Sequence, residues 1–108
     1  MGMNPTIDIS DDQRAMIVAL LERHLPGTLV WAYGSRVTGR ARPASDLDLV
    51  AFATAAQNRA VGDLREAFED SNLPFRVDVF VWDEIPESFR KNIEADYAVM
   101  AEGKDSRK

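Results

Sequence analysis

Residues 34–50 decide the fold expected for this chain of 108 residues, and they read Gly34-Ser35-Arg36-Val37-Thr38-Gly39-Arg40-Ala41-Arg42-Pro43-Ala44-Ser45-Asp46-Leu47-Asp48-Leu49-Val50. The stretch begins with a glycine–serine turn and ends with two carboxylates around a leucine. Glycine lets the backbone approach a phosphate, and a serine hydroxyl can hydrogen-bond to it. Paired carboxylates suit Mg²⁺. Together these features favour a site for a magnesium-bound nucleoside triphosphate.

Length and composition restrict the class of protein. The 108 residues, of which 45% are apolar, fit one globular domain over residues 1–108, with a frayed tail at 103–108. A net charge of −5 disfavours a general nucleic-acid-binding protein, and the lack of cysteine excludes disulfides and thiolate metal sites. Because neither a signal peptide nor an apolar run of membrane-spanning length is found, we expect a cytoplasmic protein.

The hydrophobic pattern predicts three main helices. Ser10 and Gln13 form a capping-box pattern for a helix that stops at Pro26-Gly27. A second helix is expected around Val61, Leu64 and Phe68, and Asp83 can cap a last helix with Pro86 in its first turn. The apolar stripe expected on this last helix consists of Phe89, Ile93, Tyr97 and Met100.

Strands are expected between the helices, at 29–33, 47–53 and 76–82, where short runs are rich in apolar strand formers. Strands that alternate with helices predict an α/β (α+β) fold, in which a sheet is covered by helices.

Asp46 and Asp48 lie two residues apart at the start of an expected strand, so their carboxylates point to one face, while Leu47 and Leu49 point to the core. Carboxylates this close repel each other and raise each other's pKa, and a divalent cation relieves the repulsion. The alternative is a polar strand edge with two solvated aspartates.

Asp78 interrupts a strand of valines and leaves two interpretations open. It can form an ion pair with Arg76 or Arg42. It can also complete a three-carboxylate cluster with Asp46 and Asp48, which would hold one or two Mg²⁺ ions, or accept a proton from the nucleophile.

Gly34 and Ser35 would hold phosphate, and Arg36 could neutralise more of its charge, although a plain strand-to-helix turn would have the same sequence. A P-loop is excluded, because Gly39 is followed by Arg40-Ala41 instead of Lys-Ser/Thr.

Taken together, these residues resemble the minimal nucleotidyltransferases of the DNA-polymerase-β-like superfamily. The motif is Gly34-Ser35, about ten residues, then Asp46-Leu47-Asp48, and a third acid, Asp78, on a later strand. The resemblance covers nearly the whole chain. It implies a nucleotidyltransferase fold with a small mixed sheet of three or four strands. One difference is Thr38, where many relatives have arginine.

The resemblance also implies a role for each motif residue. AMP would pass from magnesium-bound ATP to a hydroxyl. Asp46, Asp48 and Asp78 would be catalytic and hold the metal, and Gly34, Ser35, Arg36 and Ser45 would bind the nucleotide. The acceptor would be a tyrosine of a partner HEPN-domain toxin, a helical ribonuclease, which the chain would silence as an antitoxin in a hetero-oligomer. No direct contact with nucleic acid or membrane is expected.

Two alternatives remain open at this point. The chain could be a catalytically silent antitoxin that neutralises its partner by binding, or a transferase that acts on a small molecule such as an aminoglycoside.

Overall fold

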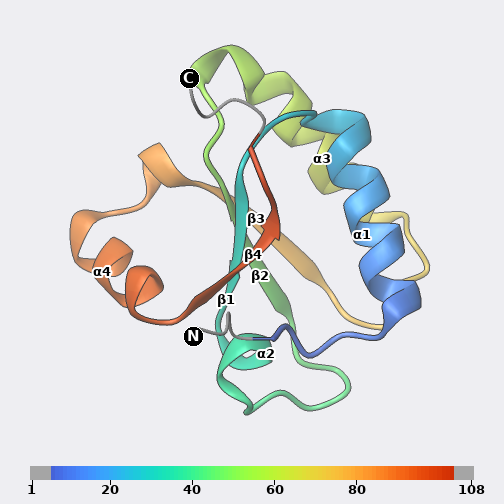
Figure 1. The fold of residues 1–108 in the computed structure, drawn as a ribbon. Helices are drawn as coiled ribbons and strands as arrows, with labels where there is room; N and C mark the ends of the chain where they lie inside the picture. The colour runs from blue at the N-terminus through green and yellow to red at the C-terminus, as the bar shows by residue number, and fades with distance from the viewer. Residues whose placement is uncertain (1–5, 104–108) are drawn as a thin grey trace.

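The structure, a computed structural model, describes residues 6–103 and contains one sheet with helices on both faces (Figure 1). Helices α1 and α3 cover one face, α4 covers the other, and the short α2 lies at one end of the sheet. The helices are α1 (Asp11–His24), α2 (Ser35–Thr38), α3 (Asn58–Glu69) and α4 (Glu87–Ala95), with 3₁₀ turns η1 (Ala55–Gln57) and η2 (Trp82–Glu84). The strands are β1 (Val30–Tyr33), β2 (Leu47–Ala51), β3 (Val77–Val81) and β4 (Tyr97–Ala101).

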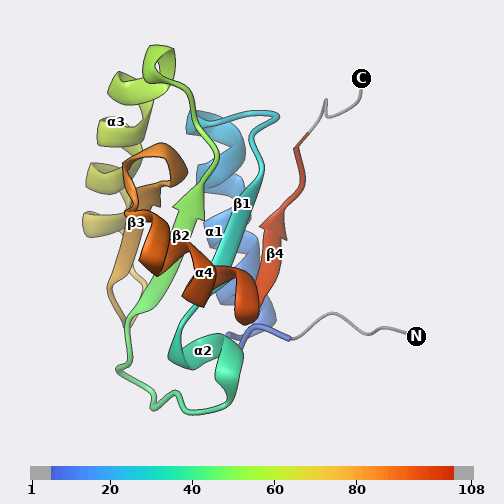
Figure 2. The ribbon, with the colours of Figure 1, turned by 90° about the vertical axis from the view of Figure 1, so that its left-hand side faces the viewer.

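The sheet is mixed, with the strand order β3-β2-β1-β4. Strand β1 is antiparallel to both β2 and β4, whereas β2 and β3 are parallel and are joined through α3. Figure 2 shows α4 lying across the sheet in front of these strands. The fold class expected from the sequence, with its small mixed sheet and flanking helices, is therefore confirmed.

The register of the sheet places one residue from each strand in a single row. Tyr33 of β1 pairs with Tyr97 of β4 on one side and with Asp48 of β2 on the other, and Asp48 pairs with Asp78 of β3. Two of the predicted acidic residues are therefore neighbours on adjacent strands.

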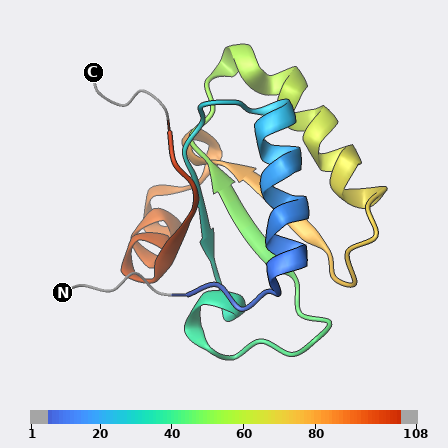
Figure 3. The same ribbon diagram turned by 45° about the vertical axis from the view of Figure 1, so that its right-hand side comes forward.

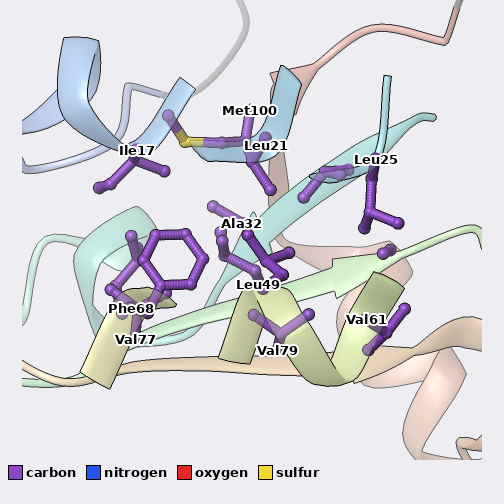
Figure 4. Packing of buried hydrophobic residues seen from close by; sticks show 14 of the residues in the cluster. Ile17, Leu21, Leu25, Ala32, Leu49, Val61, Phe68, Val77, Val79 and Met100 are labelled. Carbon is purple, nitrogen blue, oxygen red and sulfur yellow. The ribbon is translucent and has the colours of Figure 1, made fainter. Parts of the chain in front are cut away.

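The main core lies between the sheet and the helices α1 and α3, which run side by side (Figure 3). Figure 4 shows its side chains from both layers, among them Leu21 of α1, Leu49 of β2 and Val79 of β3. Leu47 and Leu49 have no exposed surface. Each fully buried side chain of this size stabilises the fold by about 1.5–3 kcal/mol, so this face of the sheet supplies most of the stability.

A smaller core lies on the opposite face, under α4. It consists of Tyr33, Val50, Ile85 and Ile93, with partly buried aromatic rings packed around it. Because side chains alternate along a strand, Asp48 and Asp78 also point to this face, away from the main core.

The first helix is capped as predicted, since the Ser10 side chain accepts a hydrogen bond from the Gln13 backbone N–H and the Gln13 side chain accepts one from the Ser10 N–H. The last helix differs from the prediction: α4 begins at Glu87, and the residue at its N-cap is Pro86 instead of Asp83. The reason is local, since Ile85 precedes a proline and adopts an extended conformation with ψ of 131°.

The predicted apolar stripe of the last helix is also wrong in part. Tyr97 and Met100 belong to strand β4, where Met100 packs into the main core, and Phe89 is exposed instead of buried. The spacing from Ile93 to Tyr97 to Met100 fits a helix, yet the pairing of β4 with β1 outweighs it.

Of the tail expected at 103–108, only Gly103 lies within the described residues, and it packs against Leu29. Across residues 6–103, no helix is long and apolar enough to cross a membrane.

Candidate functional site

The candidate site lies where β2 and β3 begin, next to the end of β1 and to α2. Asp48 and Asp78 lie side by side there, on the face of the sheet that carries α4. Asp46 comes just before β2 and is exposed to solvent. The structure therefore brings Asp48 and Asp78 together on the sheet and places Asp46 at the adjoining loop.

Asp48 has a raised pKa in the folded protein. Burial raises its pKa above the ordinary value, and the negative charges of Asp78 and then Asp46 raise it further. The repulsion expected from the sequence is therefore present, but desolvation contributes more. A cation bound at Asp48 would offset both effects.

Asp78 forms an ion pair in addition to lying beside Asp48. Its Oδ1 accepts a hydrogen bond from Arg76 Nε at 3.0 Å, and this arginine side chain is 75% exposed. An ion pair this exposed contributes little to stability. Of the two arginines considered as partners, Arg76 is the one that binds Asp78. The paired carboxylate stays beside Asp48, on the edge strand β3.

Gly34 directly follows β1, and its backbone lies close to the Asp48 carboxylate. Its φ is +89°, which favours glycine, and a Cβ built on it would lie 2.9 Å from Oδ2 of Asp48. The glycine of the Gly-Ser turn is thus required by the close approach of its backbone to a carboxylate as well as by the shape of the turn.

Ser35 is the first residue of α2, and the backbone carbonyl of Gly34 accepts hydrogen bonds from the N–H groups of Val37 and Thr38. Within residues 6–103, the Ser35 hydroxyl has no hydrogen-bond partner in the protein. It lies next to the glycine that contacts Asp48, where it is available to a ligand.

Arg36 has a different task from the expected neutralisation of phosphate charge. It is only 5% exposed, and its guanidinium donates hydrogen bonds to the backbone carbonyls of Asp8, Arg42, Pro43 and Ser45 at 2.8–3.2 Å. The carbonyls therefore take up four of its five N–H groups.

The Arg36 guanidinium also lies 4.0 Å from the centre of the Phe75 ring. It thus ties together the segment before α1, the loop that leads to Asp46 and the approach to β3. In the same loop, the Ser45 hydroxyl accepts a hydrogen bond from the Arg42 N–H at 2.8 Å. Arg36 and Ser45 shape the loop that carries the first acid.

Tyr33 is a site residue that the sequence reasoning missed. It is 8% exposed, and burial raises the pKa of its phenol, as do the negative charges of Asp48 and Asp78. The signal was present in the sequence, because Tyr33 directly precedes Gly34 and shares a strand with Trp31.

Phe80 was also missed. Two residues beyond Asp78 on the same strand, it must share the carboxylate's face of the sheet by simple alternation, and it is exposed there.

The donor set has the chemistry of a magnesium site. Within residues 6–103, no three acidic, histidine or cysteine side chains converge into a metal-binding group. Asp46, Asp48 and Asp78 offer only carboxylate oxygens, which Mg²⁺ prefers, and a bound cation would oppose the burial and repulsion that raise the pKa of Asp48.

Comparison with known families agrees with this geometry. The sequence profile of the family described as polymerase beta, nucleotidyltransferase, matches residues 16–105. The chain belongs to this family. It is therefore a nucleotidyltransferase, and the matched region contains the Gly34–Ser35 turn and the three acids.

Among curated proteins, the nucleotidyltransferase is similar to the probable protein adenylyltransferase MntA of Haemophilus influenzae. The two are 39% identical over 97 residues, which make up 89% of this chain and 85% of that protein.

Solved structures share the fold of the nucleotidyltransferase at lower identity. A crystal structure of a toxin–antitoxin with AMP-PNP is 20% identical, with a TM-score of 0.68, and the match covers 84% of this chain and 74% of that one. A tri-AMPylated Shewanella oneidensis HEPN toxin in complex with an MNT antitoxin gives 13% identity and a TM-score of 0.54, over 89% and 75% of the two chains.

Proposed function

We propose that this nucleotidyltransferase is an antitoxin, which transfers AMP from magnesium-bound ATP to a tyrosine hydroxyl of a HEPN toxin in the cytoplasm. The observation that carries the proposal is the 39% identity with a probable protein adenylyltransferase, over 89% of this chain. The fold it shares with toxin–antitoxin complexes, one of which contains an AMPylated HEPN toxin, supports the choice of partner.

The proposal gives each residue of the site a role in the reaction. Gly34 and Ser35 bind the phosphates. Arg36 and Ser45 hold the loop that leads to Asp46 and so contribute indirectly to nucleotide binding. Asp46, Asp48 and Asp78 would hold Mg²⁺, which when bound neutralises triphosphate charge and favours the ionised nucleophile.

The acceptor oxygen then bonds to the α-phosphorus, the bond to the β-phosphate oxygen breaks, and pyrophosphate leaves. The hydroxyl proton passes to Asp78, which lies at the edge of the acidic pair, next to the open side of β3.

The direct test is to identify a HEPN protein encoded by a neighbouring gene, to incubate it in purified form with this protein and magnesium-ATP, and to record the intact mass of the partner. We expect the partner to gain the mass of whole AMP groups. Asp48→Asn should abolish the gain, whereas Asp63→Asn, which changes an exposed carboxylate on α3, should not.

A double variant separates catalysis from binding. An unmodified partner in the presence of the wild-type protein would refute the proposal. Neutralisation of the toxin in cells by the double variant Asp46→Asn, Asp48→Asn would assign the antitoxin effect to binding alone.

A further inference from the structure

Exposed aromatic side chains lie next to the acidic pair. Three large apolar side chains are exposed within residues 6–103, namely Met16 (37%), Phe80 (42%) and Phe89 (44%). Met16 lies on α1, on the other side of the sheet, but Phe80 and Phe89 lie on the face that carries Asp48 and Asp78. A single exposed apolar side chain is ordinary, whereas neighbouring ones beside a polar site are candidates for a binding surface.

Tyr33 connects the two phenylalanines to the carboxylates. Its ring centre lies 6.5 Å from that of Phe80 and 6.2 Å from that of Phe89, and the second pair is nearly perpendicular, at 81°. These separations are typical of aromatic rings in contact. Since the buried Tyr33 pairs with Asp48 in the sheet, the aromatic surface of Phe80 and Phe89, which packs on Tyr33, adjoins the acidic pair.

Phe89 is held in place although it is exposed. Helix α4 is fixed by Ile93, which is 1% exposed, and by Arg90, whose Nε and an Nη donate hydrogen bonds to the Trp82 carbonyl at 3.2 and 3.0 Å. The Arg90 guanidinium also lies 5.1 Å from the centre of the Trp82 ring. The helix therefore presents Phe89 to solvent in a fixed position.

The register shows on which side of the carboxylates this surface lies. The Gly34–Ser35 turn follows the end of β1, beside the starts of β2 and β3. Phe80 lies two rows further along the sheet, where it pairs with Val50. The phosphate turn and the aromatic surface thus flank Asp48 and Asp78 from opposite directions along the strands.

In phosphoryl transfer the attacking and leaving oxygens lie in line on opposite sides of phosphorus. With the phosphates at Gly34–Ser35, the acceptor has to approach from the side of Phe80 and Phe89.

A groove along the outer edge of β3 leads to the same place. It has a volume of about 660 Å³, and its lining includes Arg65, Phe75, Asp78 and Phe80. A segment of a partner protein in this groove would end beside the aromatic surface and the carboxylate of Asp78.

We propose that Phe80 and Phe89, packed on Tyr33, form the acceptor subsite and bind the ring of the partner's tyrosine. This inference rests on the proposed function. The side chains select an aromatic acceptor by ring-to-ring contact and orient its hydroxyl toward Asp78.

The test compares Phe80→Ala and Phe89→Ala with the matched control Met16→Ala, using the full chain, magnesium-ATP and the HEPN partner. We expect kcat/KM for the partner to fall by about tenfold to a hundredfold in each phenylalanine variant. The KM for ATP should stay at its wild-type value and the melting temperature should change little, because Phe80 is 42% and Phe89 44% exposed. Phe80→Tyr should restore most of the activity, since it keeps the ring.

Three results would overturn the inference. A normal kcat/KM for the partner in both alanine variants would refute it while leaving the proposed function intact. A raised KM for ATP with an unchanged KM for the partner would assign the surface to the adenine base. A wild-type protein that leaves the partner unmodified would refute the proposed function and the inference with it.

Discussion

Gly34→Ala tests whether the Gly-Ser turn is shaped by its contact with Asp48. Two separate effects are expected from adding one methyl group. The first is backbone strain, since Gly34 has φ of +89° and ψ of −158°, a region that is almost restricted to glycine. The second is steric, since the new Cβ would lie 2.9 Å from Asp48 Oδ2, where ordinary contact begins at 3.4 Å.

The two effects have different magnitudes and different consequences. The strain should lower the free energy of unfolding by about 1–3 kcal/mol. The contact requires the Asp48 carboxylate to move by about half an ångström, which is the tolerance of a catalytic constellation. Because a misplacement of 1 Å costs about a hundredfold in rate, we expect the transfer rate to fall by about tenfold to a hundredfold.

Gly39→Ala is the matched control. Gly39 also has a positive φ, of +82°, but no atom lies within 4 Å of its built Cβ. It should lose about 1–2 kcal/mol of stability through the same kind of strain and keep a near-normal rate.

Thermal melting measures the first effect, at about 4–8 °C per kcal/mol for a domain of this size. AMP transfer to the partner, well below either melting temperature, measures the second. If both variants kept the wild-type rate, the contact between Gly34 and Asp48 would have no role in positioning the carboxylate, and the reasoning would be refuted.

Two further predictions concern Asp48 and Arg36. Because the pKa of Asp48 is raised in the folded protein, ionisation of this carboxyl should lower the free energy of unfolding as the pH rises above its ordinary pKa of about 4. In thermal melts with EDTA, Asp48→Asn should therefore melt at or above the wild-type temperature at pH 7, and the difference should vanish below about pH 4. A lower melting temperature of Asp48→Asn at pH 7 would make Asp48 a structural residue. Arg36→Lys keeps the charge but loses the planar guanidinium that donates hydrogen bonds to four carbonyls, so it should lower the free energy of unfolding, measured in urea, by about 2–4 kcal/mol. The control Arg40→Lys changes an exposed side chain and should leave this free energy unchanged. Equal urea midpoints of unfolding for the two variants would contradict the assigned role of Arg36.

Features that depend on neighbouring residues could be predicted from the sequence. The capping box at Ser10 and Gln13 formed as expected, because both partners lie within one turn. Alternation along β2 and β3 correctly placed Asp48 and Asp78 away from the main core, since it follows from strand geometry alone.

Features that depend on distant residues could not be predicted in this way. The burial of Arg36 requires carbonyls from Asp8 and from residues 42–45, and no local pattern brings these together. Residues 97–101 form a strand because they pair with β1, which is far away in the sequence. Helix α4 buries Ile93 against the sheet and leaves Phe89 exposed, which its apolar spacing alone does not predict.

The two faces of the sheet carry different residues: the main core lies on one face, and the smaller core lies on the other together with Asp48 and Asp78. Leu47 and Leu49 lie in the main core, while Asp48 lies between them on the other face. Because each strand alternates in this way, the face proposed to bind the ligands can carry a half-buried carboxylate and exposed aromatic rings without weakening the main core. A substitution of Asp48 or Phe80 should therefore change the transfer reaction while the chain remains folded, which is what makes the proposed experiments decisive.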